Sequence, residues 1–221
     1  MIVGAGDHFC PVAQFLNKTS REGLVIAREY ECRLADSETC PVDSVTAELF
    51  FSRDLEGYGW CVRKDNDLNV GFGRRGAAHF DAHVRAFIEF LTRSGRAPAS
   101  TLDIKRWRGH AYRLAGTGRP VCADGLVLIG DSAGLAYPES GEGIGPAVRS
   151  AIAAANTILA TRGAFDQGRF RPYVDFVRAT APASGFLSWL QSLVPAAIGR
   201  TLLNSPRFVR LALDRWFLRT A

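Results

Sequence analysis

The chain has few of the residues that hold small proteins together through covalent or metal bonds. Its 221 residues include 5 cysteines, an odd number, and none of them forms a C-x-x-C pair. Cysteines scattered in this way predict neither a disulfide framework nor a structural zinc site. His79 and His83 are four residues apart but do not form an H-E-x-x-H pattern. We therefore expect a reducing, cytoplasmic environment, no metal centre, and solvated positions for these two histidines.

Lysine is scarce, because only 3 of the 27 basic residues are lysine and the rest are arginine. We interpret this bias as the base composition of the genome, and we expect no nucleic-acid partner. The formal net charge is +5, but residues 149–221 contain 10 basic and 3 acidic side chains, a net of +7. A basic end of this kind suits anionic partners such as lipid headgroups, and it is also common as a solvated helix face.

The sequence shows neither a signal peptide nor a clear membrane span. Residues 1–10 have no basic region and no long apolar stretch. Residues 179–199 are uncharged and long enough to cross a bilayer, but Pro182, Pro195 and several polar residues interrupt them. Residues 186–219 combine arginine with tryptophan and phenylalanine, which suits an interfacial helix and equally suits a helical cap. Peripheral membrane contact through 186–219 is the most that we expect.

The content of apolar residues, 47%, is ample for a folded core, and 22 glycines indicate several tight backbone passages. Short apolar runs predict strands at 24–27 and 47–51, and a turn-like stretch at 64–67 predicts a hairpin. Apolar residues at 80, 84, 87, 88 and 91 have the spacing of a helix with one buried face. A further strand is expected around residues 104–114. These patterns together predict a mixed α/β protein.

The most informative segment begins with the short apolar run at residues 126–129, which suits a strand buried on both faces. Gly130 and Asp131 follow directly, and a helix is predicted from Pro146 to Ala160. An aspartate at the carboxyl end of a buried parallel strand lies where α/β sheets bind ligands. The glycines of the loop at 141–145 allow a planar ligand to approach the backbone, and the helix start would offer free N–H groups. A crossover that merely packs is the alternative.

The full string LVLIGDSAGLAYPESGEGIGPAV resembles the second flavin-contacting segment of FAD-dependent oxidoreductases with the para-hydroxybenzoate hydroxylase-type fold. In detail it is similar to the geranylgeranyl reductase family. The resemblance implies that Asp131 holds a ribitol or ribose hydroxyl of FAD and that the loop lies along the isoalloxazine ring. The cofactor-binding residues implied in this way are Gly6, Asp7, Gly130, Asp131, Pro138, Gly141, Gly143, Ile144 and Gly145.

Three other segments resemble the same family in the same order. The first, IVGAGDHFCPVA, resembles a turn that faces the cofactor. The second, GYGWCVRKDNDLNVGFG, resembles a hairpin of the substrate-binding sheet. The third, RGHAYRL, resembles the strand that returns to the cofactor domain. The resemblance implies a partial FAD-binding domain at 1–16 and 111–162, a substrate-binding β-sheet lobe at 17–110, and a helical C-terminal region at 163–221. Tyr58 and Trp60 of the hairpin either line an apolar substrate channel or pack within the sheet.

One part of the family pattern has no counterpart that we identify, namely the N-terminal Rossmann unit of a strand, a G-x-G-x-x-G turn and a helix. That unit holds the FAD pyrophosphate on a helix N-terminus. We therefore expect the first half of the cofactor domain to be missing and the chain as given to bind FAD weakly or not at all.

The activity implied by the resemblance is reduction of carbon–carbon double bonds in an apolar, isoprenoid-like small molecule. NAD(P)H or a ferredoxin-like donor would reduce the FAD, and no catalytic residue is assigned. Two alternatives stay open: a flavin monooxygenase or halogenase of the same fold, and a non-catalytic remnant that no longer binds FAD. Cys10, which could lie near the flavin or substrate, and His8 and His110, which could supply a proton, are weaker candidates, since each is more often a structural residue.

Overall fold

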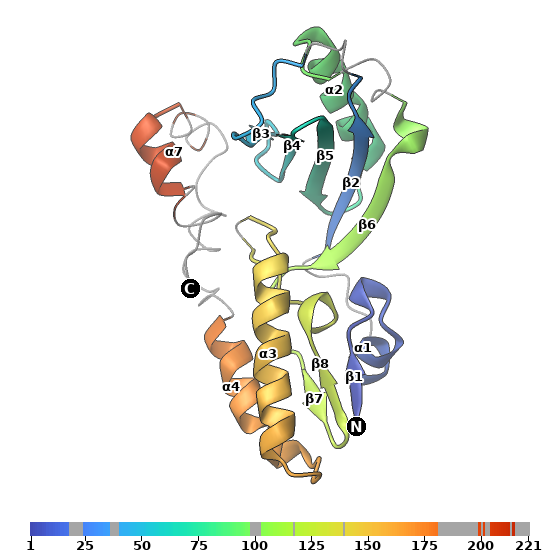
Figure 1. The fold of residues 1–221 in the computed structure, drawn as a ribbon, viewed down its shortest axis with the longest axis vertical. Coiled ribbons are helices and arrows are strands. Elements are labelled where there is room, and N and C mark those ends of the chain that lie inside the picture. Colours follow the sequence, from blue (N-terminus) through green and yellow to red (C-terminus); the bar gives the residue numbers. More distant parts are fainter. Residues whose placement is uncertain are drawn as a thin grey trace. The chain divides into compact units, whose positions relative to one another are not determined.

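The computed structural model of the chain describes residues 1–17, 24–35, 40–97, 103–116, 118–138, 140–180, 199, 201, 204–212 and 214. It is a mixed α/β protein with two sheets, which confirms the fold class expected from the sequence (Figure 1). The chain forms two compact units. The first comprises residues 1–24 and 112–221, and the second, Val25–Ala111, is inserted into it.

The first unit is built on a three-stranded sheet with the order β1-β8-β7. Strand β1 (Ile2–Gly4) runs parallel to β8 (Leu126–Leu128), and Val3 lies opposite Val127. Strand β7 (Cys122–Ala123) pairs antiparallel with β8. The central strand is fully enclosed, because Val127 and Leu128 are both 0% exposed. The apolar run at 126–129 is therefore a buried parallel strand, as predicted.

Each of the two parallel strands leads into a 3-10 turn and then a helix. Strand β1 is followed by η1 (Asp7–Phe9) and α1 (Pro11–Leu16), and β8 by η4 (Gly130–Ala133) and α3 (Ile144–Ala160). Helix α3 begins two residues before the predicted start at Pro146. The chain continues into η5 (Gln167–Phe170), α4 (Arg171–Thr180) and α7 (Pro206–Ala212).

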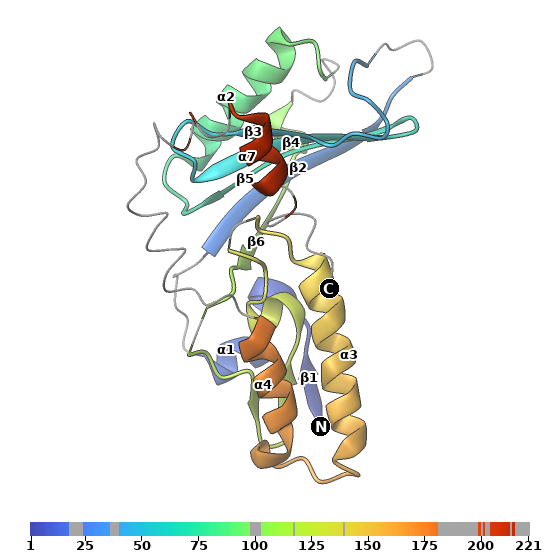
Figure 2. The ribbon, with the colours of Figure 1, turned by 90° about the vertical axis from the view of Figure 1, so that its left-hand side faces the viewer.

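The core of the first unit lies where α3 and α4 pack beside each other and against the sheet (Figures 1 and 2). Helix α3 turns its small residues Ser150 and Ala154 inward, so that helix and sheet approach closely. Tyr173 of α4 is completely buried, and its hydroxyl donates a hydrogen bond of 2.5 Å to the carbonyl of Leu128. That bond satisfies a polar group that burial would otherwise leave unpaired.

The second unit contains a five-stranded sheet with the order β3-β4-β5-β2-β6. Its elements, in chain order, are β2 (Leu24–Arg33), β3 (Glu48–Phe51), β4 (Gly57–Lys64), β5 (Asp67–Arg75), α2 (Phe80–Arg93), η3 (Ile104–Arg106) and β6 (Arg108–Arg113). Strands β4 and β5 form the predicted hairpin, with Lys64 opposite Asp67.

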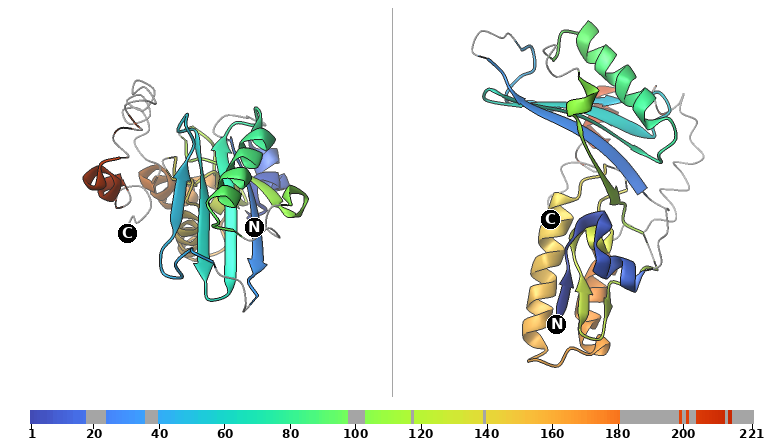
Figure 3. Two further views of the ribbon diagram at one scale, coloured as in Figure 1. Left: turned by 90° about the horizontal axis from the view of Figure 1, so that it is seen from above. Right: turned by 90° about the vertical axis from the view of Figure 1, so that its right-hand side faces the viewer.

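Helix α2 covers one face of this sheet (Figures 2 and 3). Its buried residues are the apolar ones of the predicted helical pattern: Phe80, Val84, Phe87, Ile88 and Leu91. Phe87 lies where a side chain on Gly59 would be, since an added Cβ there would overlap the phenyl ring. Cys61 is enclosed in the same core, and burial raises its pKa to about 12. This thiol is therefore a packing residue.

The opposite face of the sheet carries aromatic side chains. The indole ring of Trp60 lies over Gly71, where an added Cβ would overlap the ring. The Trp60 Nε1–H donates to Oδ1 of Asn69 at 2.6 Å, and the Tyr58 ring lies 6.1 Å away between centroids. The indole is thus held flat against the strand.

Strand β5 contains a glycine pattern that the sequence argument overlooked. Residues 71–76, GFGRRG, have the G-x-G-x-x-G spacing of a dinucleotide-binding turn. Gly71 and Gly73 are paired within the antiparallel ladder, opposite Trp60 and Tyr58 of β4. They accommodate the Trp60 ring instead of forming a phosphate-binding turn after a parallel strand.

Most of the segment expected to contact membranes, 186–219, lies outside the described residues; α7 is its main described element. Within the described part of the chain, no helix combines the length and the apolar character needed to cross a bilayer.

Candidate functional site

The two 3-10 turns of the first unit meet at the carboxyl ends of the parallel strands β1 and β8. Turn η1 packs against η4, and the Ser132 hydroxyl donates to the backbone carbonyl of Asp7 at 3.3 Å. The sequence segments around Asp7 and Asp131, more than 120 residues apart, are thereby brought to one edge of the sheet. This edge is where parallel α/β sheets bind ligands.

Asp7 adopts the left-handed backbone conformation, with φ of 60°. Its carboxylate is exposed, and Oδ1 accepts a hydrogen bond of 2.7 Å from the backbone N–H of His8. Gly6, just before it, approaches Cys10 so closely that an added Cβ would meet the Cys10 Cα at 3.2 Å. The turn is therefore held tightly, with one carboxylate facing solvent.

Cys10 occupies the position before the first turn of α1 and is 2% exposed. Burial alone raises the pKa of its thiol, but hydrogen bonds from Ser132 and from the backbone of Ala13, Gly6 and Val12 outweigh burial and lower that pKa below its ordinary value. The side chain links η1, α1 and η4. Of the two interpretations of Cys10, the structure supports a small buried residue at a helix start.

The Asp131 side chain lies against the loop that precedes α3. Its Oδ1 would be 3.1 Å from a Cβ added to Gly143, and its backbone carbonyl accepts from the N–H of Gly134 at 3.0 Å. A residue larger than glycine at 143 would therefore press on this carboxylate. The sequence predicted both residues as part of one site, and the structure brings them together.

The loop between η4 and α3 is a compact turn. The Tyr137 N–H donates to the Glu142 carbonyl at 2.9 Å, and the Gly141 N–H donates to the Tyr137 carbonyl at 2.7 Å. Gly141 has φ of +71°, and an added Cβ would lie 2.5 Å from the Tyr112 hydroxyl. Both the backbone angle and the neighbouring tyrosine require glycine here. Tyr112 was missed by the sequence argument, since no local pattern links it to the loop.

The first turn of α3 offers fewer free donors than the sequence argument expected. Oε1 of Glu142 accepts from the Gly145 N–H at 2.7 Å and so occupies one of them. Pro146 has no N–H group. The N–H groups of Gly143 and Ile144 have no acceptor among the described residues. Ile144 itself is 81% exposed. Two adjacent backbone donors are thus left at this helix end.

Two further predicted residues have clear structural surroundings. Gly130 has φ of +57°, its N–H donates to the Ser150 hydroxyl at 3.0 Å, and an added Cβ would lie 3.2 Å from the Cβ of Ala147. This glycine lets η4 pack against α3, a role that the sequence argument did not assign. Pro138 is half-buried in the loop.

His8 lies beside the site in an unusual environment. Its Nδ1 is buried without a hydrogen-bond partner among the described residues. Burial, reinforced by the nearby Arg113 cation, lowers the pKa of His8 below its ordinary value of 6.5. The ring is therefore neutral at pH 7.

We expect the stability of the first unit to depend on pH through His8. Because the folded-state pKa is lowered, the unfolded chain binds the proton more readily, and stability is lost as pH falls below 6.5. Chemical denaturation of the parent and of His8→Gln at about pH 7.5 and about pH 5.5 tests this. The denaturation midpoint should fall less on acidification in the variant. An equal fall in both proteins would contradict the assignment, since the other three histidines are unchanged.

Of the two histidines predicted to be solvated, His79 is exposed as predicted, whereas His83 is only partly exposed. His79 precedes α2 with φ of 53°, while the His83 ring stacks on Phe72 and contacts a guanidinium nitrogen of Arg74. His83 is therefore a packed residue and not simply a solvated one. Among the residues that the structure describes, no three side chains form a metal-binding group.

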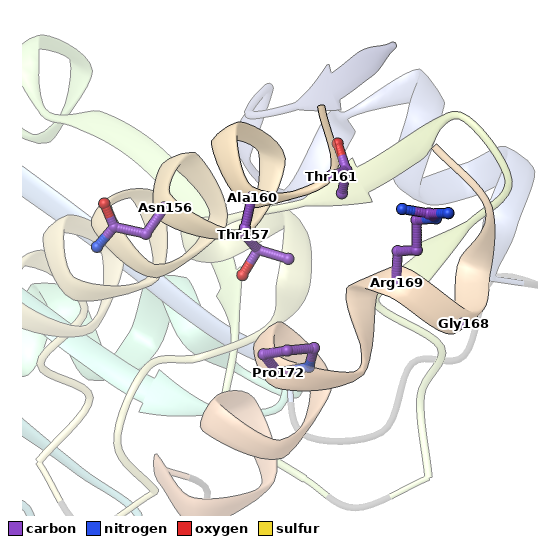
Figure 4. A pocket seen from close by; sticks show the side chains of 7 residues that line it. All are labelled: Asn156, Thr157, Ala160, Thr161, Gly168, Arg169 and Pro172. Carbon is purple, nitrogen blue, oxygen red and sulfur yellow. The ribbon is translucent and has the colours of Figure 1, made fainter. Parts of the chain in front are cut away.

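A pocket of about 470 Å³ lies at the other end of α3, between that helix and the η5–α4 segment (Figure 4). Three of its polar side chains are bonded internally: the Thr157 and Thr161 hydroxyls donate to carbonyls of α3, and Arg169 pairs with Asp166. The pocket is separate from the Asp131–Gly143 edge.

No family model matches the chain, and no curated protein matches it either. Solved structures do. A geranylgeranyl bacteriochlorophyll reductase-like protein from Thermoplasma acidophilum is 17% identical, with a TM-score of 0.63 over 91% of this chain and 54% of that one. The myxobacterial FAD-dependent halogenase CndH is 17% identical, with a TM-score of 0.54 over 94% and 56%. A variant of HpxO from Klebsiella pneumoniae, complexed with FAD, is 15% identical, with a TM-score of 0.51 over 82% and 50%.

The chain thus spans little more than half the length of these solved proteins. At such low identity the likeness concerns the fold alone, so membership of one particular family stays a prediction. The chain has the fold of FAD-dependent flavoenzymes.

Proposed function

We propose that the chain is part of an FAD-dependent oxidoreductase that reduces carbon–carbon double bonds of an apolar, isoprenoid-like substrate. The observation that carries this proposal is the meeting of η1 and η4 at the ends of two parallel strands, with the Asp131 carboxylate set against Gly143 at the start of α3. The fold, shared with FAD-dependent enzymes, supports FAD as the ligand of this edge.

The residues at the site fit such a ligand. Asp131 would accept a hydrogen bond from a ribose or ribitol hydroxyl. The free N–H groups of Gly143 and Ile144 would donate to the N1–C2=O edge of the flavin. The partial positive charge of the helix start stabilises negative charge at that edge, and the absence of a Cβ at Gly143 keeps the approach open. When bound, FAD supplies hydride transfer.

The second unit supports an apolar substrate. Trp60 presents a flat ring fixed by Asn69, and Tyr58 and Phe51 extend the aromatic face, with Phe51 40% exposed. Apolar and aromatic surfaces of this kind bind apolar ligands with little loss of side-chain entropy, because the rings are already held. The reductant of the flavin in this proposal is NAD(P)H or a ferredoxin-like donor.

Two measurements test the function. Calorimetric titration of FAD into the purified chain should show weak but saturable binding of one FAD, in line with the weak binding expected from the sequence, and absence of saturable binding up to the solubility limit of FAD would overturn the cofactor assignment for this chain. The FAD-loaded protein is then reduced chemically without oxygen and incubated with a polyprenyl alcohol. Mass spectrometry should detect the addition of two hydrogen atoms per flavin oxidised. Substrate hydroxylation or halogenation in air, without anaerobic hydrogenation, would instead indicate a monooxygenase or halogenase.

A further inference from the structure

A carboxylate and a guanidinium lie together at the first turn of α3. Oε1 of Glu142 and both terminal nitrogens of Arg149 would each be 3.4 Å from a Cβ added to Gly145. Oε1 of Glu142 accepts from the Gly145 N–H at 2.7 Å, and Arg149 donates to the Tyr137 hydroxyl at 2.5 Å. Among the described residues, the two groups form no ion pair with each other or with a third group. Two opposite charges therefore stand at this helix start without direct neutralisation.

The Glu142 carboxylate is fixed in place. Its backbone N–H donates to the Ser140 hydroxyl at 3.2 Å, and its carbonyl accepts from the Tyr137 N–H at 2.9 Å. Its side chain caps α3 from the position before Gly143, the N-cap residue, where a side chain would press on Asp131. Because both its backbone and its side chain are bonded, this charge keeps one position relative to the helix start.

The Arg149 charge reaches the same turn from one turn further along the helix. Long side chains on a helix point back toward its N-terminus, and Arg149 lies four residues after Gly145. The hydroxyl that accepts its hydrogen bond belongs to Tyr137, which is only 7% exposed. The guanidinium is thus anchored to a buried side chain and, like the carboxylate, has a fixed position.

These two charges border the donors to which the proposed function assigns the flavin. The N–H groups of Gly143 and Ile144 directly precede that of Gly145, which the carboxylate accepts. Reduction of a flavin adds two electrons and one proton, and the negative charge that remains collects at its N1–C2=O edge. A neighbouring carboxylate repels this charge, and a guanidinium attracts it. Because one helix turn rises only about 5.4 Å, charges on this turn act within the screening length of about 8–10 Å.

We propose that Glu142 and Arg149 set the redox potential of the bound flavin in opposite directions. This inference rests on the proposed function, because it requires the flavin at the start of α3. Glu142 destabilises the reduced, negatively charged flavin relative to the oxidised flavin and so lowers the potential, whereas Arg149 raises it. A lower potential makes the reduced flavin a stronger hydride donor, so Glu142 favours the proposed reduction of a substrate.

Binding of FAD in its two redox states tests the proposal. Oxidised FAD is titrated calorimetrically into the chain, and dithionite-reduced FAD is titrated in the same way without oxygen. The ratio of the oxidised to the reduced dissociation constant gives the shift in potential on binding, about 30 mV for each tenfold change in a two-electron couple. Glu142→Gln keeps an acceptor for the Gly145 N–H and removes only the charge. It should raise this ratio about three- to tenfold, which corresponds to about 14–30 mV.

Two further variants make the measurement specific. Arg149→Gln removes the opposite charge and should lower the ratio about threefold. The control Asp175→Asn removes an exposed carboxylate of α4, whose contacts with arginine are long, and should leave the ratio unchanged. Circular dichroism establishes that each variant is folded, and Arg149→Gln decides the question if Glu142→Gln does not fold.

The outcomes separate this inference from the function on which it rests. An unchanged ratio in Glu142→Gln, or shifts of the same sign in Glu142→Gln and Arg149→Gln, would overturn the inference and leave the FAD assignment intact. So would a shift in Asp175→Asn as large as that in Glu142→Gln. If the parent binds FAD in neither redox state, the proposed function itself fails, and this inference fails with it.

Discussion

Asp131→Ala is expected to weaken FAD binding about tenfold to a hundredfold. The carboxylate lies at the carboxyl end of β8, beside Gly143 and the free donors at the start of α3. In the proposed complex it accepts a charge-assisted hydrogen bond from a sugar hydroxyl, and loss of such a bond costs roughly 1.5–3 kcal/mol. Equilibrium titration of FAD, followed by quenching of flavin fluorescence, measures the change.

Two variants make this measurement specific. Asp131→Asn keeps an acceptor oxygen at the same place and should lose less affinity than Asp131→Ala. Asp175→Ala removes an exposed carboxylate of α4, whose contacts with Arg171 and Arg178 are long, and should leave FAD affinity unchanged. Equal dissociation constants for the parent and Asp131→Ala, with both proteins folded, would exclude the proposed role of Asp131.

Tyr173→Ala is expected to lower the free energy of unfolding of the first unit by roughly 3–5 kcal/mol, the range for truncating a large aromatic side chain in a core. Tyr173 is 0% exposed and packs between α3 and the sheet. Its removal leaves a cavity and also leaves the Leu128 carbonyl without its donor. Burial raises the pKa of the Tyr173 phenol, so the hydroxyl stays protonated and able to donate at neutral pH.

Tyr173→Phe separates packing from hydrogen bonding. It retains the ring and removes only the hydroxyl, so it should cost about 1–3 kcal/mol. Hydrogen exchange of the β8 amides, followed by mass spectrometry, reports on the first unit without mixing in unfolding of the second. Unchanged exchange of β8 in Tyr173→Ala would contradict the core position assigned to this residue.

The elements that the sequence predicted well are those whose pattern is local. The spacing of Phe80, Val84 and Phe87 depends only on one helix and one face, and α2 follows it. The β4–β5 hairpin likewise needs only its own turn. The strand expected at 104–114 was less accurate: residues 104–106 form the 3-10 turn η3, because the Asp103 side chain accepts from the Lys105 N–H. Such a side-chain cap competes with strand formation.

The candidate site was predictable as a set of residues but not as an arrangement. The glycine and aspartate positions at 130–145 stand out in the sequence, and the structure places Asp131 beside Gly143. The residues that contact them are distant in sequence or belong to no recognisable motif. Tyr112 lies against Gly141, and the Ser150 hydroxyl accepts a hydrogen bond from the Gly130 N–H. Glu142 was predicted only as a loop residue, but its side chain accepts a hydrogen bond from the Gly145 N–H in the first turn of α3. Contacts of this kind follow from packing between elements, which periodicity does not encode.

The insertion of the second unit into the first has a consequence for biosynthesis. Residues 25–111 leave the ribosome before β8, the strand that pairs with β1, has been made. After Gly4 has been made, 124 further residues are added before its partner Leu128 is complete. At about 5–20 residues per second, this takes roughly 6–25 s. During that interval Ile2 and Val3 lack their partner strand β8, whereas the five-stranded sheet of the second unit can close. The β1 segment is thus one that we expect a nascent-chain chaperone to bind.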